Sequence, residues 1–253
     1  MGEIATQNPI DARLDVSRRL NPSRKSELGQ FMTPAAIATF MASLFSATSR
    51  TIHLLDAGAG VGSLTNAFLT RFQGSAASVE AWEIDPVLKM VLTDTLASYA
   101  RAGLASTIHN SDFIEDAVWN ISMGGGKRFT HAILNPPYRK IKSDSKHRYL
   151  LRDVGVETVN LYTAFLALAI LLMEEKGEIV AIVPRSFCNG TYYRPFREQL
   201  LQSCAIEHIH VFEARNKAFS DDDVLQENII VKLKKSGAQG EVTVSESHDS
   251  TFG

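Results

Sequence analysis

Short apolar runs alternate along this chain with longer segments whose apolar residues recur three or four positions apart. The short runs are typical of buried strands and occupy residues 51–55, 77–82, 105–109, 129–134, 178–183, 206–211 and 227–233. Most of the longer segments have the period of a helix that buries one face. Because strands and helices alternate, we predict an α/β fold with a doubly wound, mostly parallel, seven-stranded sheet and helices on both faces.

Three of the predicted helices carry local signals. Thr33 is expected to cap a helix that begins at Pro34. The run from Leu161 to Met173 is the most apolar of the chain, but it is too short to cross a bilayer, so we expect a buried helix. The helix that begins at Pro86 is expected to turn five side chains toward the core, namely Val87, Met90, Val91, Leu96 and Tyr99.

Length and composition indicate an ordinary globular protein. The chain has 253 residues, of which 45% are hydrophobic and 21% charged. We expect residues 28–235 to form one domain between an N-terminal arm at 1–27 and a polar linker or tail at 236–253. The two cysteines, Cys188 and Cys204, are expected to be reduced core thiols of a cytoplasmic protein. No signal peptide, membrane span or metal-binding motif is expected.

A glycine-rich segment follows the first predicted strand. Asp56 is followed by Gly58, Gly60 and Gly62, and a helix begins soon after. Glycines at such a turn allow a ligand to approach the backbone closely. Glu83 ends the second strand, where an acidic residue commonly binds ribose hydroxyls. Together these signals predict an adenosine-containing cofactor, although the glycines alone would suit a nicotinamide cofactor or a methyl donor equally.

Asp112 and Phe113 follow the third predicted strand. An acidic and an aromatic side chain at this position could bind and sandwich an adenine ring. Asp112 could equally well cap the helix that follows, since Asp favours that role.

Asn135, Pro136, Pro137 and Tyr138 follow the fourth predicted strand. The two prolines fix the backbone and remove two N–H donors, so the Asn135 side-chain oxygen and the Pro136 carbonyl can form a rigid acceptor pair. Such a pair beside the Tyr138 ring suits an amino group on a flat ring. The simpler interpretation is an Asn-Pro turn with Tyr138 as packing.

The densest basic stretch begins directly after Tyr138. Its members are Arg139, Lys140, Lys142, Lys146, His147, Arg148 and Arg152. The net charge of −2 means that attraction to nucleic acid must come from a local surface such as this one. The stretch is therefore a candidate for phosphate contacts, or else an ordinary solvated face.

The ordered set of motifs resembles the γ-class amino-methyltransferases of restriction-modification systems, which methylate the N6 amine of adenine in DNA. The resemblance runs from about Leu28 to Lys235 and implies a class I S-adenosylmethionine-dependent methyltransferase fold. It rests on the sequence Gly-Gln-Phe-Met-Thr-Pro at 29–34, Asp-Ala-Gly-Ala-Gly at 56–60, Glu-Ile-Asp at 83–85, Ser-Asp-Phe at 111–113, Asn-Pro-Pro-Tyr at 135–138 and Val-Pro-Arg-Ser-Phe at 183–187.

The resemblance implies S-adenosylmethionine as the methyl donor and assigns residues to it. Glu83 would meet the ribose, Asp112 the adenine amine, and Ile84 and Phe113 the two faces of the adenine ring. The segment 29–34, which we call the front element, and the glycine loop would bind the methionine part of the donor, with Asn135 beside it. The residues assigned to this part are Gln30, Phe31, Met32 and Thr33 of the front element and Asp56, Gly58 and Gly60 of the glycine loop.

The implied substrate is double-stranded DNA with one adenine flipped out of the helix. Asn135 and the Pro136 carbonyl would hold the N6 amine, and Tyr138 would stack on the ring. Phe219 would cover the opposite face, and Arg139 with Lys140 would contact phosphates. These enzymes usually continue into a target-recognition domain, so the chain is expected to be a catalytic domain alone or to need a separate recognition chain.

Three other functions remain open. A methyltransferase acting on RNA adenine or on a protein glutamine amide could use the same acceptor pair. A nicotinamide-dependent oxidoreductase could use the same sheet, but no hydride-transfer acid or base stands out. The third is a catalytically silent subunit that binds the donor but no DNA.

Overall fold

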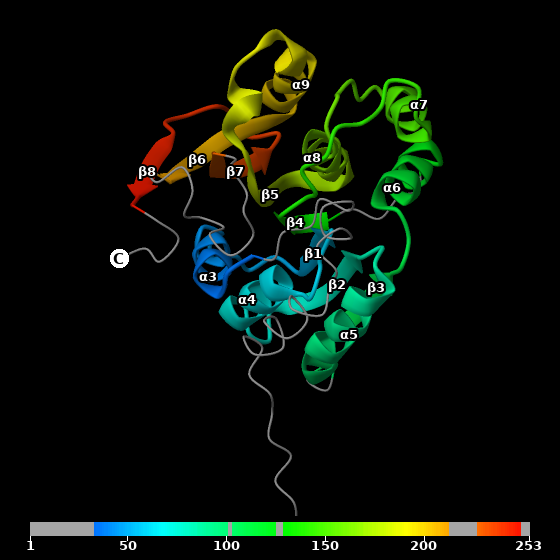
Figure 1. Ribbon diagram of the computed structural model, residues 1–253. Helices are drawn as coiled ribbons and strands as arrows, with labels where there is room; N and C mark the ends of the chain where they lie inside the picture. The colour runs from blue at the N-terminus through cyan, green and yellow to red at the C-terminus, as the bar shows by residue number, and fades with distance from the viewer. Residues whose placement is uncertain (1–32, 101–102, 125–128, 213–226, 249–253) are drawn as a thin grey trace, which may run out of the picture.

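The computed structural model describes residues 33–100, 103–124, 129–212 and 227–248, which build one eight-stranded sheet (Figure 1). The spatial order is β3-β2-β1-β4-β5-β7-β6-β8. Strands β3, β2, β1, β4 and β5 run parallel, β7 is antiparallel to β5 and β6, and β8 is parallel to β6. The strands are β1 Ile52–Ala57, β2 Ala76–Trp82, β3 Ala105–His109, β4 Phe129–Leu134, β5 Met173–Pro184, β6 Cys204–Phe212, β7 Asn228–Lys235 and β8 Thr243–Ser247.

The doubly wound, mostly parallel α/β fold is confirmed, but the predicted number of strands is wrong by one. The additional strand, β8, lies inside residues 236–253, which were expected to be a linker or tail. It was missed because its sequence, Thr-Val-Ser-Glu-Ser, contains one strongly apolar residue and all five side chains are exposed or half-buried. An edge strand of this kind has no buried face for hydrophobic periodicity to reveal.

Helices cover both faces of the sheet (Figure 1). Leu54 packs in a core with the helices of one face, whereas Leu55 packs in the core of the other, as alternate strand residues should. The first face carries α3 Ala35–Ser43, α4 Ser63–Arg71 and α5 Pro86–Ala100. The second carries α6 Phe113–Ser122, α8 Leu161–Leu172 and α9 Arg194–Ser203, with α7 Lys146–Asp153 against α6 and the short 3-10 helices η1 Arg185–Cys188 and η2 Thr191–Tyr193 after β5.

The apolar helix α8 is buried as predicted, and buried side chains lie on all sides of it. Within the described residues, no helix is both long and apolar enough to span a membrane. Two other burial predictions are wrong. Cys204 is buried but Cys188 is exposed. Helix α5 buries a face made of Leu88, Leu92 and Leu96, while Val87 and Met90, predicted to be core residues, are exposed.

The chain reverses its direction of travel across the sheet between β1 and β4. From β1 it moves outward through β2 to β3, and it returns to β4 before moving to β5 on the other side. The loops that follow neighbouring strands β1 and β4 therefore leave in opposite directions and open a crevice, which is where ligands bind in open α/β sheets. The glycine loop follows β1, and the segment that starts at Asn135 follows β4.

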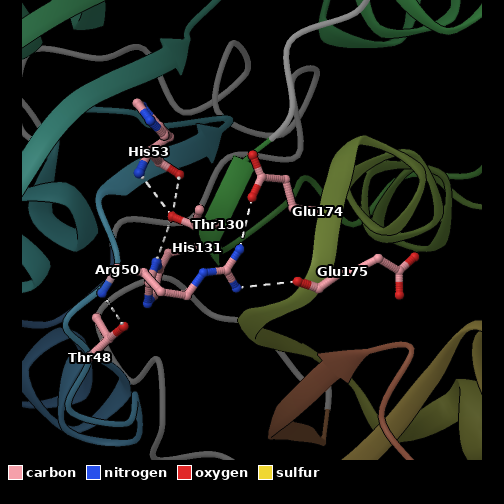
Figure 2. A network of polar contacts seen from close by, with 7 residues as sticks. All are labelled: Thr48, Arg50, His53, Thr130, His131, Glu174 and Glu175. Carbon is pink, nitrogen blue, oxygen red and sulfur yellow. Dashed lines mark hydrogen bonds and ion pairs between the residues drawn. The ribbon is translucent and has the colours of Figure 1, made fainter.

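A polar network joins the amino-terminal ends of β1, β4 and β5, whereas the loops of the crevice lie at the carboxyl-terminal ends (Figure 2). Arg50 contacts the Glu174 carboxylate at 2.8 Å and the Glu175 carbonyl at 3.2 Å. Thr130 accepts a hydrogen bond from the His53 backbone at 2.9 Å, and its hydroxyl lies 2.9 Å from Nδ1 of His131. The network ties β1, β4 and β5 together where each strand begins.

Acid is expected to destabilise the fold through His131, whose ring lies among those of Phe45, Phe68 and Phe72. Burial lowers the pKa of His131 from 6.5 to about 4. Between these values the unfolded chain binds a proton that the folded chain does not, so the free energy of unfolding should fall by about 3 kcal/mol between pH 7 and pH 4. Urea unfolding at several pH values measures this.

The matched control is His131→Phe, which keeps an aromatic ring in the same surroundings but cannot titrate. Its stability should lack this part of the acid dependence. The same change of stability with pH in both proteins would contradict the assignment to His131.

Candidate functional site

The glycine loop is shaped by three left-handed residues. Gly58, Gly60 and Gly62 have φ values of 78°, 57° and 84°, which side chains with a Cβ rarely adopt. A Cβ on Gly62 would lie 2.8 Å from the Leu92 side chain, so this glycine also permits close packing of the glycine loop on α5. At Gly60 a Cβ would meet no atom of the described residues within 4 Å. As far as the described part of the chain is concerned, the middle of the loop borders open space.

Glu83, at the end of β2, is buried and holds the backbone around it. Its Oε2 accepts a hydrogen bond from the Gly60 amide at 2.9 Å, and its Oε1 accepts one from the Asp85 amide at 2.7 Å. The Asn110 side chain donates to the carbonyls of Glu83 and Ile84 at 2.8 and 3.0 Å. The Ile84 side chain itself is 50% exposed. The acidic residue and the glycine loop are thus in contact, and the binding of a ribose by Glu83 remains a prediction.

Asp56 lies fully buried at the end of β1. Its Oδ2 accepts a hydrogen bond from the Thr65 hydroxyl at 2.5 Å, whereas its Oδ1 is buried and has no hydrogen-bond partner among the described residues. Burial raises the pKa of Asp56 to about 7; the hydrogen bonds from Thr65 oppose this rise and the charge of Glu83 adds to it. Through Thr65, on α4, Asp56 fixes the helix that follows the glycine loop.

Asp112 caps helix α6, one of the two roles that its sequence position allows. Its Oδ1 accepts hydrogen bonds from the amides of Ile114 and Glu115 at 2.8 and 3.2 Å. Its Oδ2 lies 2.9 Å from Nε2 of His147. Burial alone would raise the pKa of Asp112, but His147 and the two amides outweigh it and lower the pKa, and the same contact raises the pKa of His147.

Phe113 belongs to the core. Its ring lies 5.4 Å from the ring of Trp82 and 5.0 Å from that of Phe165. The side chain is only 2% exposed. Only part of its surface could therefore reach a ligand, whereas Ile84 offers half of its surface.

Asn135 is held on both sides of its amide group. Its Nδ2 donates a hydrogen bond to the Thr33 hydroxyl at 2.9 Å, and its Oδ1 accepts one from the Tyr138 hydroxyl at 2.9 Å. Thr33 is therefore not the cap of α3, contrary to prediction. Pro34 takes that position, and its carbonyl accepts the hydrogen bond from the Ala38 amide at 2.9 Å. The hydroxyl of Thr33 instead links the front element to the segment after β4.

The glycine loop and the Asn135 segment lie next to each other. A Cβ built on Gly58 would be 3.9 Å from the Asn135 carbonyl oxygen and 3.8 Å from Cδ of Pro137. Pro136 is buried and Pro137 is half-buried. Sequence motifs that are about eighty residues apart thus form one site at the crevice between β1 and β4.

Tyr138 has a contact that the sequence did not predict. Besides donating to Asn135, its hydroxyl lies 3.4 Å from the Ile182 carbonyl oxygen, and its ring meets that of Tyr162 edge-on at 6.2 Å. Burial raises the pKa of Tyr138, so it remains a hydroxyl donor. The phenol orients the Asn135 amide, and the predicted stacking on a substrate ring remains a prediction.

Most of the basic stretch is engaged with acidic residues. Lys146 contacts Glu115 at 2.6 Å, and Arg148 and Arg152 both bind Glu157. These side chains brace α7 rather than offering unopposed charge. Arg139 and Lys140 are exposed directly beyond Tyr138, and the Leu161 amide donates to the Arg139 carbonyl at 2.7 Å. They remain the candidates for phosphate contacts.

Gln30, Phe31, Met32 and Phe219 lie outside the described residues. Sequence reasoning did not predict the contacts of three side chains that hold the site together, namely Thr65, Asn110 and His147. Each joins two different elements of the fold, so no local pattern marks the contact. Among the described residues, no group of three or more His, Cys, Asp or Glu side chains is arranged to hold a metal ion.

The fold is the one found in class I S-adenosylmethionine-dependent methyltransferases. A Listeria monocytogenes protein assigned to that class has a similar fold, with a TM-score of 0.70 and 14% identity over 99% of this chain and 76% of that chain. Residues 77–219, more than half of the chain, match the model of the Eco57I restriction-modification methylase family. The chain belongs to this family.

Two curated relatives are much closer in sequence. The chain is 51% identical to the Type II methyltransferase M.BsuBI of Bacillus subtilis, over 94% of this chain and 50% of the relative. It is 42% identical to the Type II methyltransferase M.PstI of Providencia stuartii, over 96% of this chain and 51% of the relative. The predicted resemblance to restriction-modification methyltransferases is thus confirmed, and the chain spans about half the length of these relatives.

Proposed function

We propose that this chain is the donor-binding and catalytic part of a site-specific DNA methyltransferase that methylates N6 of adenine. The observation that carries the proposal is the junction at Asn135. Its amide is oriented by Thr33 and Tyr138, and its carbonyl lies beside Gly58 of the glycine loop. A methyl donor bound at the glycine loop would therefore lie close to a rigid acceptor for an amino group. The names of the two curated relatives agree with this function.

The residues present fit S-adenosylmethionine. Open space at Gly60 allows a ligand to approach the loop backbone, and Glu83 offers a buried carboxylate beside it. We assign the ribose to Glu83, the adenine amine to Asp112 and one face of the adenine ring to Ile84. Thr33, with the front element Gln30, Phe31 and Met32, and the loop at Gly58 would hold the methionine part. Asp56 holds the helix that follows this loop through Thr65.

On the substrate side, Asn135 and Pro136 supply the two acceptors. S-adenosylmethionine supplies an electrophilic methyl group on sulfur. The adenine N6 is a weak nucleophile because its lone pair is delocalised into the ring. Hydrogen bonds from N6 to the Asn135 Oδ1 and the Pro136 carbonyl favour a tetrahedral nitrogen and offset the positive charge that develops there. An amide oxygen can accept two hydrogen bonds, so the bond from Tyr138 is compatible with this role.

The base must leave the duplex for its N6 to reach the Asn135 and Pro136 acceptors, because the amine is base-paired and stacked inside double-stranded DNA. Tyr138 and Phe219 are the proposed aromatic contacts of the flipped ring, and Arg139 and Lys140 the proposed phosphate contacts. Much of the rate would come from alignment of N6 with the methyl group. A strong general base is not required, because the proton can leave after the transfer.

The test is methylation of plasmid DNA with a tritiated donor, followed by mass spectrometry of the nucleosides. We expect label in N6-methyladenine. Because the chain spans about half of its relatives, it should be assayed alone and fused to the half of the Bacillus subtilis relative that it does not match. Label in neither case would reject the activity. Methylation of RNA or of a protein glutamine instead would support the alternative substrates.

A further inference from the structure

The carboxylate of Asp112 is held from two elements at once. Its Oδ1 caps α6 through two backbone amides, at 2.8 and 3.2 Å. Its Oδ2 lies 2.9 Å from Nε2 of His147, at the start of α7. Both side chains are partly exposed, 25% for Asp112 and 29% for His147. A helix cap needs only one carboxylate oxygen, so the contact with His147 calls for a separate explanation.

We propose that His147 is a positioning residue for recognition of the donor's adenine. This inference rests on the proposed function, which assigns the adenine amine to Asp112. The two amides hold Oδ1, but the longer of their hydrogen bonds, at 3.2 Å, leaves the carboxylate some freedom to turn about the bond between Cβ and Cγ. The hydrogen bond from His147 to the second oxygen removes that freedom. An ionised carboxylate oxygen accepts about two hydrogen bonds, so Oδ2 can bind the imidazole and the amine together.

The structure explains why His147 reaches Asp112. Ser145 caps α7 by accepting a hydrogen bond from the Arg148 amide, so Lys146 and His147 occupy the first turn. Lys146 contacts Glu115 on α6 at 2.6 Å, one turn from Asp112. The charged groups acting on the imidazole are thus Asp112 and Glu115 from α6 and Lys146 from its own helix. The chain offers two neighbouring contacts between the same two helices, and only one of them involves Asp112.

This pair of contacts provides a matched control. The probes are S-adenosylhomocysteine and its analogue in which an oxo group replaces the adenine amine, and calorimetry gives the Kd of each. We expect the wild-type protein to prefer the amine by about tenfold or more, as for a hydrogen bond to a charged acceptor. His147→Ala should reduce this preference at least threefold. His147→Gln, whose amide can donate from a similar place, should restore most of it, and Lys146→Ala should leave it unchanged.

The outcomes distinguish a failure of the role proposed for His147 from a failure of the proposed donor site. Failure of the wild-type protein to bind S-adenosylhomocysteine would overturn the proposed donor site and this inference with it. Binding of S-adenosylhomocysteine with an unchanged preference in His147→Ala would overturn the inference alone. An equal loss in Lys146→Ala would also overturn it, because the effect would then come from docking of α7. Thermal unfolding of each variant shows that the fold is intact.

Discussion

Replacing Asn135 with alanine is expected to slow methyl transfer by a factor on the order of 10² or more, while the donor still binds. The side chain supplies an acceptor that is needed most when N6 becomes tetrahedral and positive, and loss of one preoriented group of this kind typically costs that much. Two proposed contacts of the donor are held elsewhere, since Gly58 lies beside the Asn135 backbone carbonyl and Glu83 beside the Gly60 amide. Thr33, a third, loses the hydrogen bond from Nδ2, so we expect only a modest loss of donor affinity. Single-turnover transfer of tritium to DNA measures the rate, and calorimetry measures donor binding.

The control for Asn135 is aspartate, which keeps an acceptor oxygen at the same place. A carboxylate can accept from both Tyr138 and Thr33, whose hydroxyls now contact the two ends of the amide. Asn135→Asp should therefore retain measurably more activity than Asn135→Ala. Wild-type turnover in Asn135→Ala would remove this residue from the mechanism. Equal loss of rate and of donor binding would mean that the junction is structural.

The sequence predicted the parts of the fold that depend on buried, regular patterns. Each of the seven predicted strands is present. The central strands β4 and β5 are buried along most of their length and are mostly apolar, whereas the five side chains of the edge strand β3 are exposed or half-buried. Helix α5 shows the limit of this reasoning. Its sequence has apolar residues on two sides, and the structure buries Leu88 and Leu92 rather than Val87 and Met90. Leu92 packs beside Gly62, a contact that the local sequence does not reveal.

The site could be predicted as a set of loops but not as a network. Strand ends that carry glycines, Glu83, Asp112 and Asn135 meet at one edge because parallel strands share their direction. The contacts of each side chain could not be predicted from the sequence. Lys146 and Arg148 appeared to be available for phosphate, yet they bind Glu115 and Glu157, because charge pairing across a fold leaves no mark in local sequence.

Replacing Glu83 with alanine is expected to weaken donor binding by about 10²-fold. The proposed contact with ribose would supply charge-assisted hydrogen bonds, each worth about 1.5–3 kcal/mol, and about 1.4 kcal/mol corresponds to a factor of ten. The same substitution also removes the acceptors of the Gly60 and Asp85 amides. Glu83→Gln keeps one acceptor oxygen, and its loss should be smaller. Calorimetric titration with S-adenosylhomocysteine measures both.

Loss of affinity alone would not show that Glu83 touches the ribose, because a disordered glycine loop would also bind the donor poorly. The 2′-deoxy analogue of S-adenosylhomocysteine separates the two explanations. If Glu83 accepts from the ribose, the wild-type protein should bind the deoxy analogue more weakly, and Glu83→Ala should bind both ligands alike. If the penalty for the missing hydroxyl persists in Glu83→Ala, then Glu83 acts only by holding Gly60, and the ribose must be recognised elsewhere.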